Sequence, residues 1–208
     1  AYGYCESNET DYTDTHKLNA DLIRVQSLHR SLSPISDIRS FFQLRKIIKI
    51  QKPDLVNTHT SKAGVLARLA TKSVNRKTPV VHTFHGHLIY GYFARYKSFV
   101  FTLIEKIMSR FTNVAVAVTA ETKNSLTKLG IGRNLPWRVI QIGIPAKVVT
   151  QTAATEQTFK ILWIGRFTQI KDPSLAVKVM KNLSDAGQER FELTMVGEGE
   201  LFEEVKQE

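Results

Sequence analysis

The stretch NVAVAVTAETKNSLTKLG, residues 113–130, decides the fold class of this chain. Its first seven residues are apolar at most positions, which is typical of a strand buried on both faces. The next ten residues have the pattern of a helix, and Gly130 is the kind of residue that ends one. A buried strand followed directly by a helix is the repeating unit of parallel α/β sheets, so the same unit should recur elsewhere.

Short apolar segments do alternate with helical segments along most of the chain. Before the deciding stretch, strands are predicted at 22–28, 54–58 and 79–84, and helices at 37–51, 61–72 and 96–110, the first with Asp37 as N-cap. After it, strands are predicted at 137–142, 159–164 and 191–196, a helix at 173–186, and the start of another at 200–208. The pattern indicates an α/β protein built from parallel sheets.

Charge divides the chain into two parts. The 208 residues carry a formal net charge of +10. Residues 1–150 hold 22 basic and 9 acidic residues, a net of +13, whereas residues 151–208 hold 7 and 10, a net of −3. The polar stretch around residues 150–158 resembles a linker. We predict an N-terminal domain at 1–148, a linker at 149–158 and a second domain from 159, with a cleft between the two domains.

The strongly basic first part should favour an anionic partner, namely nucleic acid, a membrane surface or a phosphorylated substrate. A nucleic-acid-binding signature is absent, and so is a P-loop. Cys5 is the single cysteine, which excludes an internal disulfide and a cysteine-based zinc site. A reducing compartment is therefore expected.

Polar residues follow the predicted strands of the first domain, where ligands of open parallel sheets bind. Ser61 and Lys62 open a helix and could bind an anion or a sugar hydroxyl, although Thr60 or Ser61 could instead be a simple N-cap. His85 could donate a hydrogen bond or act as an acid or base. A metal site from His59, His85 and His87 is disfavoured, because no carboxylate or cysteine accompanies them.

Glycines and cations follow the predicted strands of the second domain. Gly165 permits close approach of a ligand to the backbone, and Arg166 and Lys171 together could grip a diphosphate. The later segment Gly197-Glu198-Gly199 does not complete a dinucleotide-binding pattern, because Phe202 stands where a third glycine would be needed. A base or ribose could still lie against these glycines.

Four segments, in this order, resemble the glycosyltransferase group 1 superfamily (family 4), which has the GT-B fold. They are Lys52-Pro-Asp-Leu-Val-Asn-Thr-His-Thr-Ser-Lys-Ala-Gly64, Val80-Val-His-Thr-Phe-His-Gly-His87, Gly165-Arg166 with Lys171-Asp172, and Met195-Val-Gly-Glu-Gly199. The stretch 115–129 resembles the strand–helix unit of the family, with Thr119 and Glu121 at its polar positions. The likeness is greatest to bacterial enzymes of capsule, exopolysaccharide or O-antigen assembly.

The resemblance implies a retaining, metal-independent transfer of a sugar from a nucleotide donor to a saccharide acceptor, which we expect to be lipid-linked. Arg166 and Lys171 would stabilise the leaving diphosphate, and His85 would contact the donor sugar as a further catalytic residue. No cofactor is expected beyond a UDP- or GDP-linked sugar as co-substrate. The remaining implied contacts are Gly165, Gly197, Glu198 and Gly199 for the nucleotide and His59, Ser61, Lys62, His87 and Glu121 for the acceptor.

The chain also departs from the pattern of the family. Ile142-Gly-Ile-Pro145 stands where the family has Asn-Gly-Ile-Asp, and Asn57-Thr-His-Thr60 stands where it has His-Thr-His-Thr. The first strand with its glycine-rich loop, and the acidic E-x7-E motif, are expected outside residues 1–208. Both GT-B domains, each with the parallel sheet of a Rossmann-like fold, would then be incomplete here, and we expect the chain to be inactive alone.

Two segments could contact an anionic membrane. The predicted helix from Arg39 to Lys52 combines cations with apolar residues, and the segment from Tyr90 to Lys97 combines cations with aromatic residues. Phe41 and Ile48 are expected in the core instead. A cytoplasmic protein at the inner face of the membrane would fit this pattern. The alternatives are a nucleotide-sugar epimerase, with Glu121 as its acid or base, a nucleic-acid-binding module, and a degenerate remnant.

Overall fold

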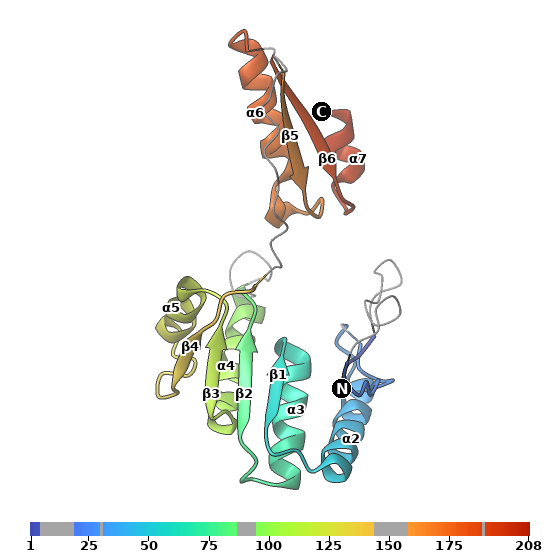
Figure 1. Ribbon diagram of the computed structural model, residues 1–208, viewed down its shortest axis with the longest axis vertical. Helices are drawn as coiled ribbons and strands as arrows, with labels where there is room; N and C mark the ends of the chain where they lie inside the picture. Colours follow the sequence, from blue (N-terminus) through green and yellow to red (C-terminus); the bar gives the residue numbers. More distant parts are fainter. Residues whose placement is uncertain (5–18, 30, 87–94, 144–157, 189) are drawn as a thin grey trace. The chain divides into compact units, whose positions relative to one another are not determined.

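A computed structural model describes residues 1–4, 19–29, 31–86, 95–143, 158–188 and 190–208 (Figure 1). The chain divides into two compact units, unit 1 (Ala1–Ile144) and unit 2 (Pro145–Glu208). Each unit contains a parallel sheet, which confirms the predicted α/β class. The predicted linker lies outside the described residues except for Thr158, and the boundaries at 148 and 159 stay predictions.

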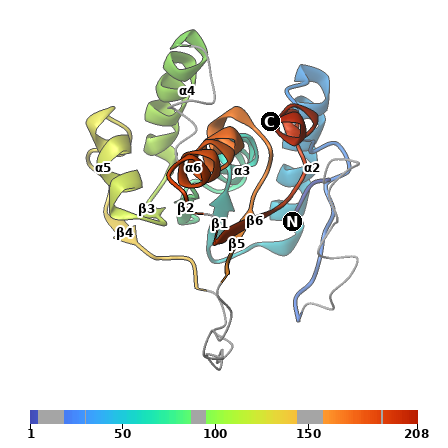
Figure 2. The ribbon, with the colours of Figure 1, turned by 90° about the horizontal axis from the view of Figure 1, so that it is seen from above.

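Unit 1 contains one parallel sheet whose strands follow one another in chain order. These strands are β1 (Val56–His59), β2 (Val80–Phe84), β3 (Val114–Ala117) and β4 (Trp137–Val139). The register pairs Thr58 with His82, and His82 with Ala115. Right-handed crossovers between sequential parallel strands place the connecting helices on one side of a sheet. Figure 2 shows α2, α3 and α4 on the same side of β1–β3.

The helices of unit 1 begin and end within three residues of their predicted bounds. They are α2 (Pro34–Gln51), α3 (Ser61–Val74), α4 (Arg95–Met108) and α5 (Ala120–Lys128), with the short 3₁₀ helix η1 (Ser109–Phe111) after α4. The prediction of Asp37 as N-cap is wrong. Pro34 begins α2, because its fixed φ suits the first helical turn and its missing N–H leaves no donor unsatisfied there.

Two apolar clusters hold unit 1 together. The first packs Leu44 and Ile48 of α2 against Ala70 of α3 and against Val25 and Leu28. The placement of Ile48 in the core is thus confirmed, and Phe41 packs partly buried against the same cluster. The second cluster buries Leu126 and Ile131 against the aromatic rings of Phe84, Phe101 and Trp137. Every connecting helix of the unit therefore buries one face, as amphipathic helices on a sheet must.

A buried ion pair links α3 to α4. Both Nη2 contacts of Arg68, to Oε1 and Oε2 of Glu105, are 2.9 Å long, and the two side chains are 1% and 0% exposed. The Nε of Arg68 also donates to the carbonyl of Gly64 at 3.0 Å, and Nη1 donates to the hydroxyl of Thr112 at 3.4 Å. Every edge of the guanidinium thus has an acceptor, which is what burial of a charge requires.

Unit 2 has a two-stranded parallel sheet. It contains β5 (Phe159–Ile164), the 3₁₀ helix η2 (Gln169–Lys171), α6 (Pro173–Asp185), β6 (Phe191–Val196) and α7 (Phe202–Gln207). Phe159 pairs with Phe191 and Ile164 with Val196, so the two strands end at the same edge. The loops that follow both strands consequently meet there.

One predicted strand is wrong. Residues 22–28 form only a single parallel bridge, between Arg24 and Tyr2. Val25 N donates to Tyr2 O, but the chain then turns back, with Leu28 N donating to Val25 O at 3.0 Å. The hydroxyls of Ser27 and Ser40 lie 2.8 Å apart, so this turn is fastened to α2 rather than extended along a neighbour.

Among the described residues, no helix is both long and apolar enough to span a bilayer.

We expect Glu105→Leu to lower the free energy of unfolding of unit 1 by about 3–5 kcal/mol, because it leaves the Arg68 guanidinium buried without its partner. The double variant Arg68→Met/Glu105→Leu should recover most of this loss, since the two apolar side chains need no ionic partner. Urea unfolding followed by circular dichroism measures both. Glu121→Gln, at an exposed carboxylate, is the control and should change stability by less than about 0.5 kcal/mol. A single variant as stable as the parent would show that the pair contributes nothing.

Candidate functional site

Two histidines meet where β1 and β2 end. His59 is the last residue of β1, and His85 directly follows β2. Their rings are hydrogen-bonded, with His59 Nδ1 2.8 Å from His85 Nε2, and both side chains are exposed. Only one of these two nitrogens can carry the shared proton. The pair therefore fixes the orientation of both rings and leaves Nε2 of His59 and Nδ1 of His85 for a ligand.

A third histidine, His82, lies buried on the other face of the same sheet. Its Nδ1 is 2.8 Å from the hydroxyl of Thr58, which also donates to the carbonyl of Val81 at 3.1 Å. Because a hydroxyl has one proton, this pattern makes His82 Nδ1 the donor to Thr58. Gly64 in the first turn of α3 packs on the ring, and a Cβ at that position would lie 2.5 Å from His82 Cε1. A glycine is thus required for α3 to start this close to β2.

Burial keeps His82 neutral. Desolvation, followed by the nearby charges of Arg68, His59 and His85, lowers the pKa of His82 from 6.5 to about 3. The pKa of His59 is also lowered, first by partial burial and then by His85. At neutral pH the exposed imidazole of His59 is therefore uncharged, and it can exchange hydrogen bonds with sugar hydroxyls as donor or acceptor.

Thr60, between β1 and α3, has φ 60 and ψ 163 and is the N-cap residue of α3. This region of backbone space is normally reserved for glycine, and a β-branched residue in it is strained. Its side chain makes no capping hydrogen bond, so the expected simple N-cap is not formed by Thr60. Strain of this kind tends to occur in binding loops held by a rigid frame.

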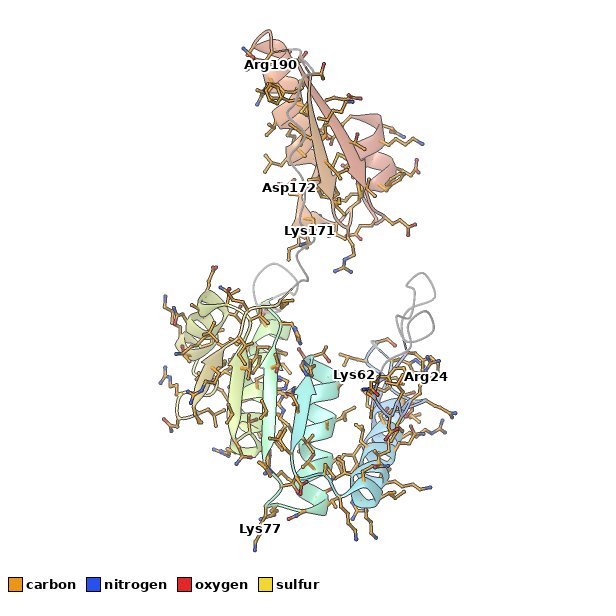
Figure 3. All side chains as sticks on the ribbon, viewed as in Figure 1. Arg24, Lys62, Lys77, Lys171, Asp172 and Arg190 are labelled. Carbon is orange, nitrogen blue, oxygen red and sulfur yellow. The ribbon has the colours of Figure 1, made fainter. Side chains whose placement is uncertain are left out.

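Lys62 has a structural role in unit 1. Its Nζ donates to the carbonyls of His29 and Ser31 at 2.8 and 2.6 Å and forms an ion pair with Asp37 (Figure 3). The ammonium group of Lys62 thus contacts two carbonyls of the segment before α2 and a carboxylate in the first turn of α2. Sequence reasoning assigned Lys62 to the acceptor, whereas the structure uses it to tie α2 to the first turn of α3.

The other residues expected near the acceptor are spread along this edge. Ser61 is the first residue of α3 and is partly buried. Glu121 is exposed in the first turn of α5, behind Thr119, whose hydroxyl accepts a hydrogen bond from Thr122 N at 3.0 Å. His87 lies outside the described residues, as does most of the segment Tyr90–Lys97. Among the residues that the structure describes, no three potential metal ligands come together.

In unit 2 the loops after β5 and β6 are joined backbone to backbone. Gly165 N donates to Val196 O at 3.0 Å, and Phe167 N donates to Glu198 O at 2.8 Å. A Cβ on Gly197 would lie 1.8 Å from the Gly165 carbonyl oxygen, and one on Gly199 would lie 2.3 Å from that of Phe167. The two glycines, at φ 150 and 154, are therefore explained by this loop contact before any ligand is considered.

Arg166 and Lys171 lie in this joined pair of loops, and both are exposed. Lys171 is the last residue of η2, and Figure 3 shows it at the edge of unit 2 where β5 and β6 end. Neither side chain forms an ion pair with another described residue. Two unpaired cations on a rigid loop next to the start of α6 suit a diphosphate.

Sequence reasoning missed the supporting residues His82, Arg68 and Glu105. A histidine inside the apolar run 79–84 was a signal for a buried, neutral imidazole, since charged groups avoid such positions. Arg68 gave no such signal, because it stands on a helix where arginines are usually exposed.

The fold and the candidate site define a class: a parallel α/β protein with polar side chains and cations at the carboxyl ends of its strands. Residues 7–147, more than half of the chain, match the family described as Glycosyltransferase Family 4. The chain belongs to this family.

Curated relatives and solved structures agree with this assignment. The chain is 27% identical over 173 residues to the O-antigen biosynthesis glycosyltransferase WbnH of Escherichia coli, covering 83% of this chain and 48% of that protein. It is 26% identical over 212 residues to the UDP-Gal:alpha-D-GlcNAc-diphosphoundecaprenol alpha-1,3-galactosyltransferase of Escherichia coli, covering 95% and 53%. The chain thus spans about half the length of the curated relatives it matches. HepE of Anabaena, crystallised with UDP and glucose, has the same fold, with a TM-score of 0.67 at 14% identity over 90% of this chain and 51% of that one.

Acid should destabilise unit 1 through His82. Its folded-state pKa of about 3 lies below the unfolded value of 6.5, so the unfolded chain takes up a proton first as pH falls. The stability from neutral His82 is complete above pH 6.5 and decreases by about 1.4 kcal/mol per pH unit down to the folded-state pKa. His82→Asn, which can keep a bond to Thr58, should lose this part of the slope. Urea unfolding at several pH values measures it, and parallel slopes for both proteins would refute a neutral buried His82.

Gly197→Ala should destabilise unit 2 by more than about 2 kcal/mol, because the new Cβ would collide with the Gly165 carbonyl and the backbone would be strained. Gly187→Ala is the matched control. It also has a positive φ, of 71, but a Cβ there would meet nothing within 4 Å. It should therefore cost only about 1–2 kcal/mol of backbone strain. Equal losses in urea unfolding would show that the loop contact at Gly197 is absent.

Proposed function

We propose that this protein transfers a sugar from a nucleotide-sugar donor to a saccharide acceptor in cell-surface polysaccharide synthesis, with retention of anomeric configuration and without a metal ion. The observation that carries the proposal is that Arg166 and Lys171, on the joined loops of unit 2, are exposed and form no ion pair with any described residue. Membership of Glycosyltransferase Family 4 supports the class of reaction.

Negative charge grows on the diphosphate oxygens as the bond between the sugar and the diphosphate breaks. Arg166 and Lys171 are held by loops that already hydrogen-bond to each other, so they need not reorganise as this charge develops. Preorganised cations lower the barrier by stabilising the transition state more than the ground state. They take the place that a divalent cation would otherwise have.

His85 is proposed to contact the donor sugar near the reacting carbon. The hydrogen bond shared with His59 restrains its ring, and the neutral His82 beneath supports this end of β2. Ser61, Glu121 and His59 would bind the acceptor at the same edge of unit 1, whereas Lys62 would support them structurally. A lipid-linked acceptor is proposed because one relative is named for a diphosphoundecaprenol-linked substrate. The reaction would then take place at the inner face of the membrane.

An epimerase would need carboxylates as acid and base beside the sugar. Glu121 was the candidate for that role, but it stands exposed in the first turn of α5, where a carboxylate also suits the positive helix end. The named relatives are transferases, which favours transfer.

We expect Arg166→Ala and Lys171→Ala each to lower kcat by about 10²–10³-fold, because each removes charge that stabilises the leaving diphosphate. Lys181→Ala, at an exposed cation on α6, is the control and should be unaffected. The assay uses protein expressed from its complete reading frame, UDP-linked hexoses, an undecaprenyl-diphosphate-linked saccharide, and a chelator. NMR coupling constants of the product report the anomeric configuration. Activity that requires added divalent cation would refute metal independence, and isomerised donor without acceptor would favour an epimerase.

A further inference from the structure

The outward surface of α2 is apolar at its N-terminal end. Ile35, Ile38 and Phe42 are 68%, 59% and 59% exposed, and Leu32, just before the helix, is 85% exposed. Their spacing along the helix places Ile35, Ile38 and Phe42 on one side. The opposite side of α2 is the one that buries Leu44 and Ile48. The helix therefore has a second apolar stripe that no described residue covers.

The same outward surface continues as a row of cations. Arg39, Arg45, Lys46 and Lys49 are all exposed and stand at helical spacings from Ile35 and Phe42. Asp37 is the one carboxylate within α2, and Lys62 already neutralises it. None of the four cations forms an ion pair within the part of the chain that the structure describes. We call Leu32, Ile35, Ile38, Arg39, Phe42, Arg45, Lys46 and Lys49 the α2 surface.

The apolar end of the α2 surface lies beside the candidate acceptor edge. Lys62, in the first turn of α3, donates to the carbonyls of His29 and Ser31 and pairs with Asp37. The start of α2 is thereby fixed to the helix that directly follows His59. Figure 3 shows Lys62 between the end of β1 and α2.

We propose that the α2 surface docks on an anionic lipid bilayer, with Leu32, Ile35, Ile38 and Phe42 entering the headgroup–acyl boundary and the four cations bound to anionic headgroups. A stripe of aliphatic and aromatic residues next to unpaired cations is the pattern of a helix lying in a membrane interface. This inference deepens the proposed function, because docking there presents the acceptor edge of unit 1 to a lipid-linked saccharide. It does not depend on sugar transfer for its test.

Charge alone would also fit nucleic acid, but exposed aliphatic side chains gain nothing against a phosphate backbone. The outward stripe of α4, with Phe99, Leu103 and Ile107 exposed, is the other candidate surface. Only Lys106 and Arg110 accompany it among the described cations of α4 and η1. The α2 surface therefore offers both apolar side chains for the bilayer boundary and more cations for anionic headgroups.

Vesicle cosedimentation tests the proposal. The chain should bind vesicles of phosphatidylglycerol and phosphatidylcholine in equal parts, bind weakly to phosphatidylcholine alone, and lose affinity as salt rises. Replacing Arg39, Arg45, Lys46 and Lys49 by Gln should lower the partition coefficient by at least about 100-fold, since each cation contributes several-fold. Ile35→Ser/Ile38→Ser/Phe42→Ser should also lose binding. The matched control is Phe99→Ser/Leu103→Ser/Ile107→Ser, which should bind as the parent does.

Circular dichroism of each variant shows whether a loss of vesicle binding is caused by a loss of folding. A second measurement uses single substitutions that keep the surface apolar. Phe42→Trp should show added fluorescence quenching by lipids brominated on their acyl chains, whereas Phe99→Trp should not. Equal binding by the parent and the α2 variants, loss of binding in the α4 variant alone, or quenching at position 99 alone would overturn the proposal. So would salt-sensitive DNA binding that survives Ile35→Ser/Ile38→Ser/Phe42→Ser without any vesicle binding. Sugar transfer without vesicle binding would leave the proposed function standing and this inference refuted.

Discussion

Unit 1 is organised around one buried guanidinium. Arg68 reaches Glu105 on α4, the carbonyl of Gly64 in the first turn of α3, and Thr112 just before β3. Because an unpaired charge in this position would be very costly, the three segments must keep their relative positions for the fold to exist. Burial raises the pKa of Glu105 and lowers that of Arg68, whereas the contact between the two side chains acts in the opposite direction on each pKa and favours the charged forms. Apolar packing alone is not directional, whereas hydrogen bonds from three guanidinium nitrogens to three different segments restrain the position of α3.

The candidate site of unit 1 depends on that arrangement. With α3 fixed at Gly64, the ring of His82 fits against a residue without a side chain. Arg68 is the largest nearby charge that helps to keep His82 neutral, after desolvation. A neutral His82 can remain buried under the ends of β1 and β2, where His59 and His85 bond to each other. The polar edge thus follows from the buried pair through a chain of direct contacts.

Much of this fold was predictable, and the failures have physical reasons. The strand at 113–119 was predictable because its apolar residues lie on both faces, and β3 indeed has three of its four residues buried. The prediction of a strand at 22–28 was wrong because these residues form a turn instead. The turn is held against α2 by the contact between the hydroxyls of Ser27 and Ser40, which local sequence does not reveal. The sequence singled out Lys62 as an acceptor contact and the glycines at 197 and 199 as nucleotide contacts, and these roles stay predictions. The contacts that the structure shows for them, an ion pair with Asp37 and a close approach of two loops, are tertiary contacts that sequence spacing does not reveal.

Some cations of the chain contact acceptors within the protein, whereas others have no ion-pair partner among the described residues. Cations of the second kind are available to bind an external anion. Lys62 and Arg68 face carboxylates, and Lys72 donates to the carbonyls of Arg76 and Thr78, with a pKa lowered by burial. These three cations stabilise the fold, and their charged groups already contact acceptors within the protein. Arg166 and Lys171 in unit 2 and the four cations of the α2 surface are among the exposed cations that have no such partner within the described residues. Exposed cations without a carboxylate partner favour binding of an external anion, because the anion is attracted without breaking an existing ion pair. Two cations that follow the end of one strand suit a compact diphosphate, whereas a row along a helix suits a flat array of headgroups.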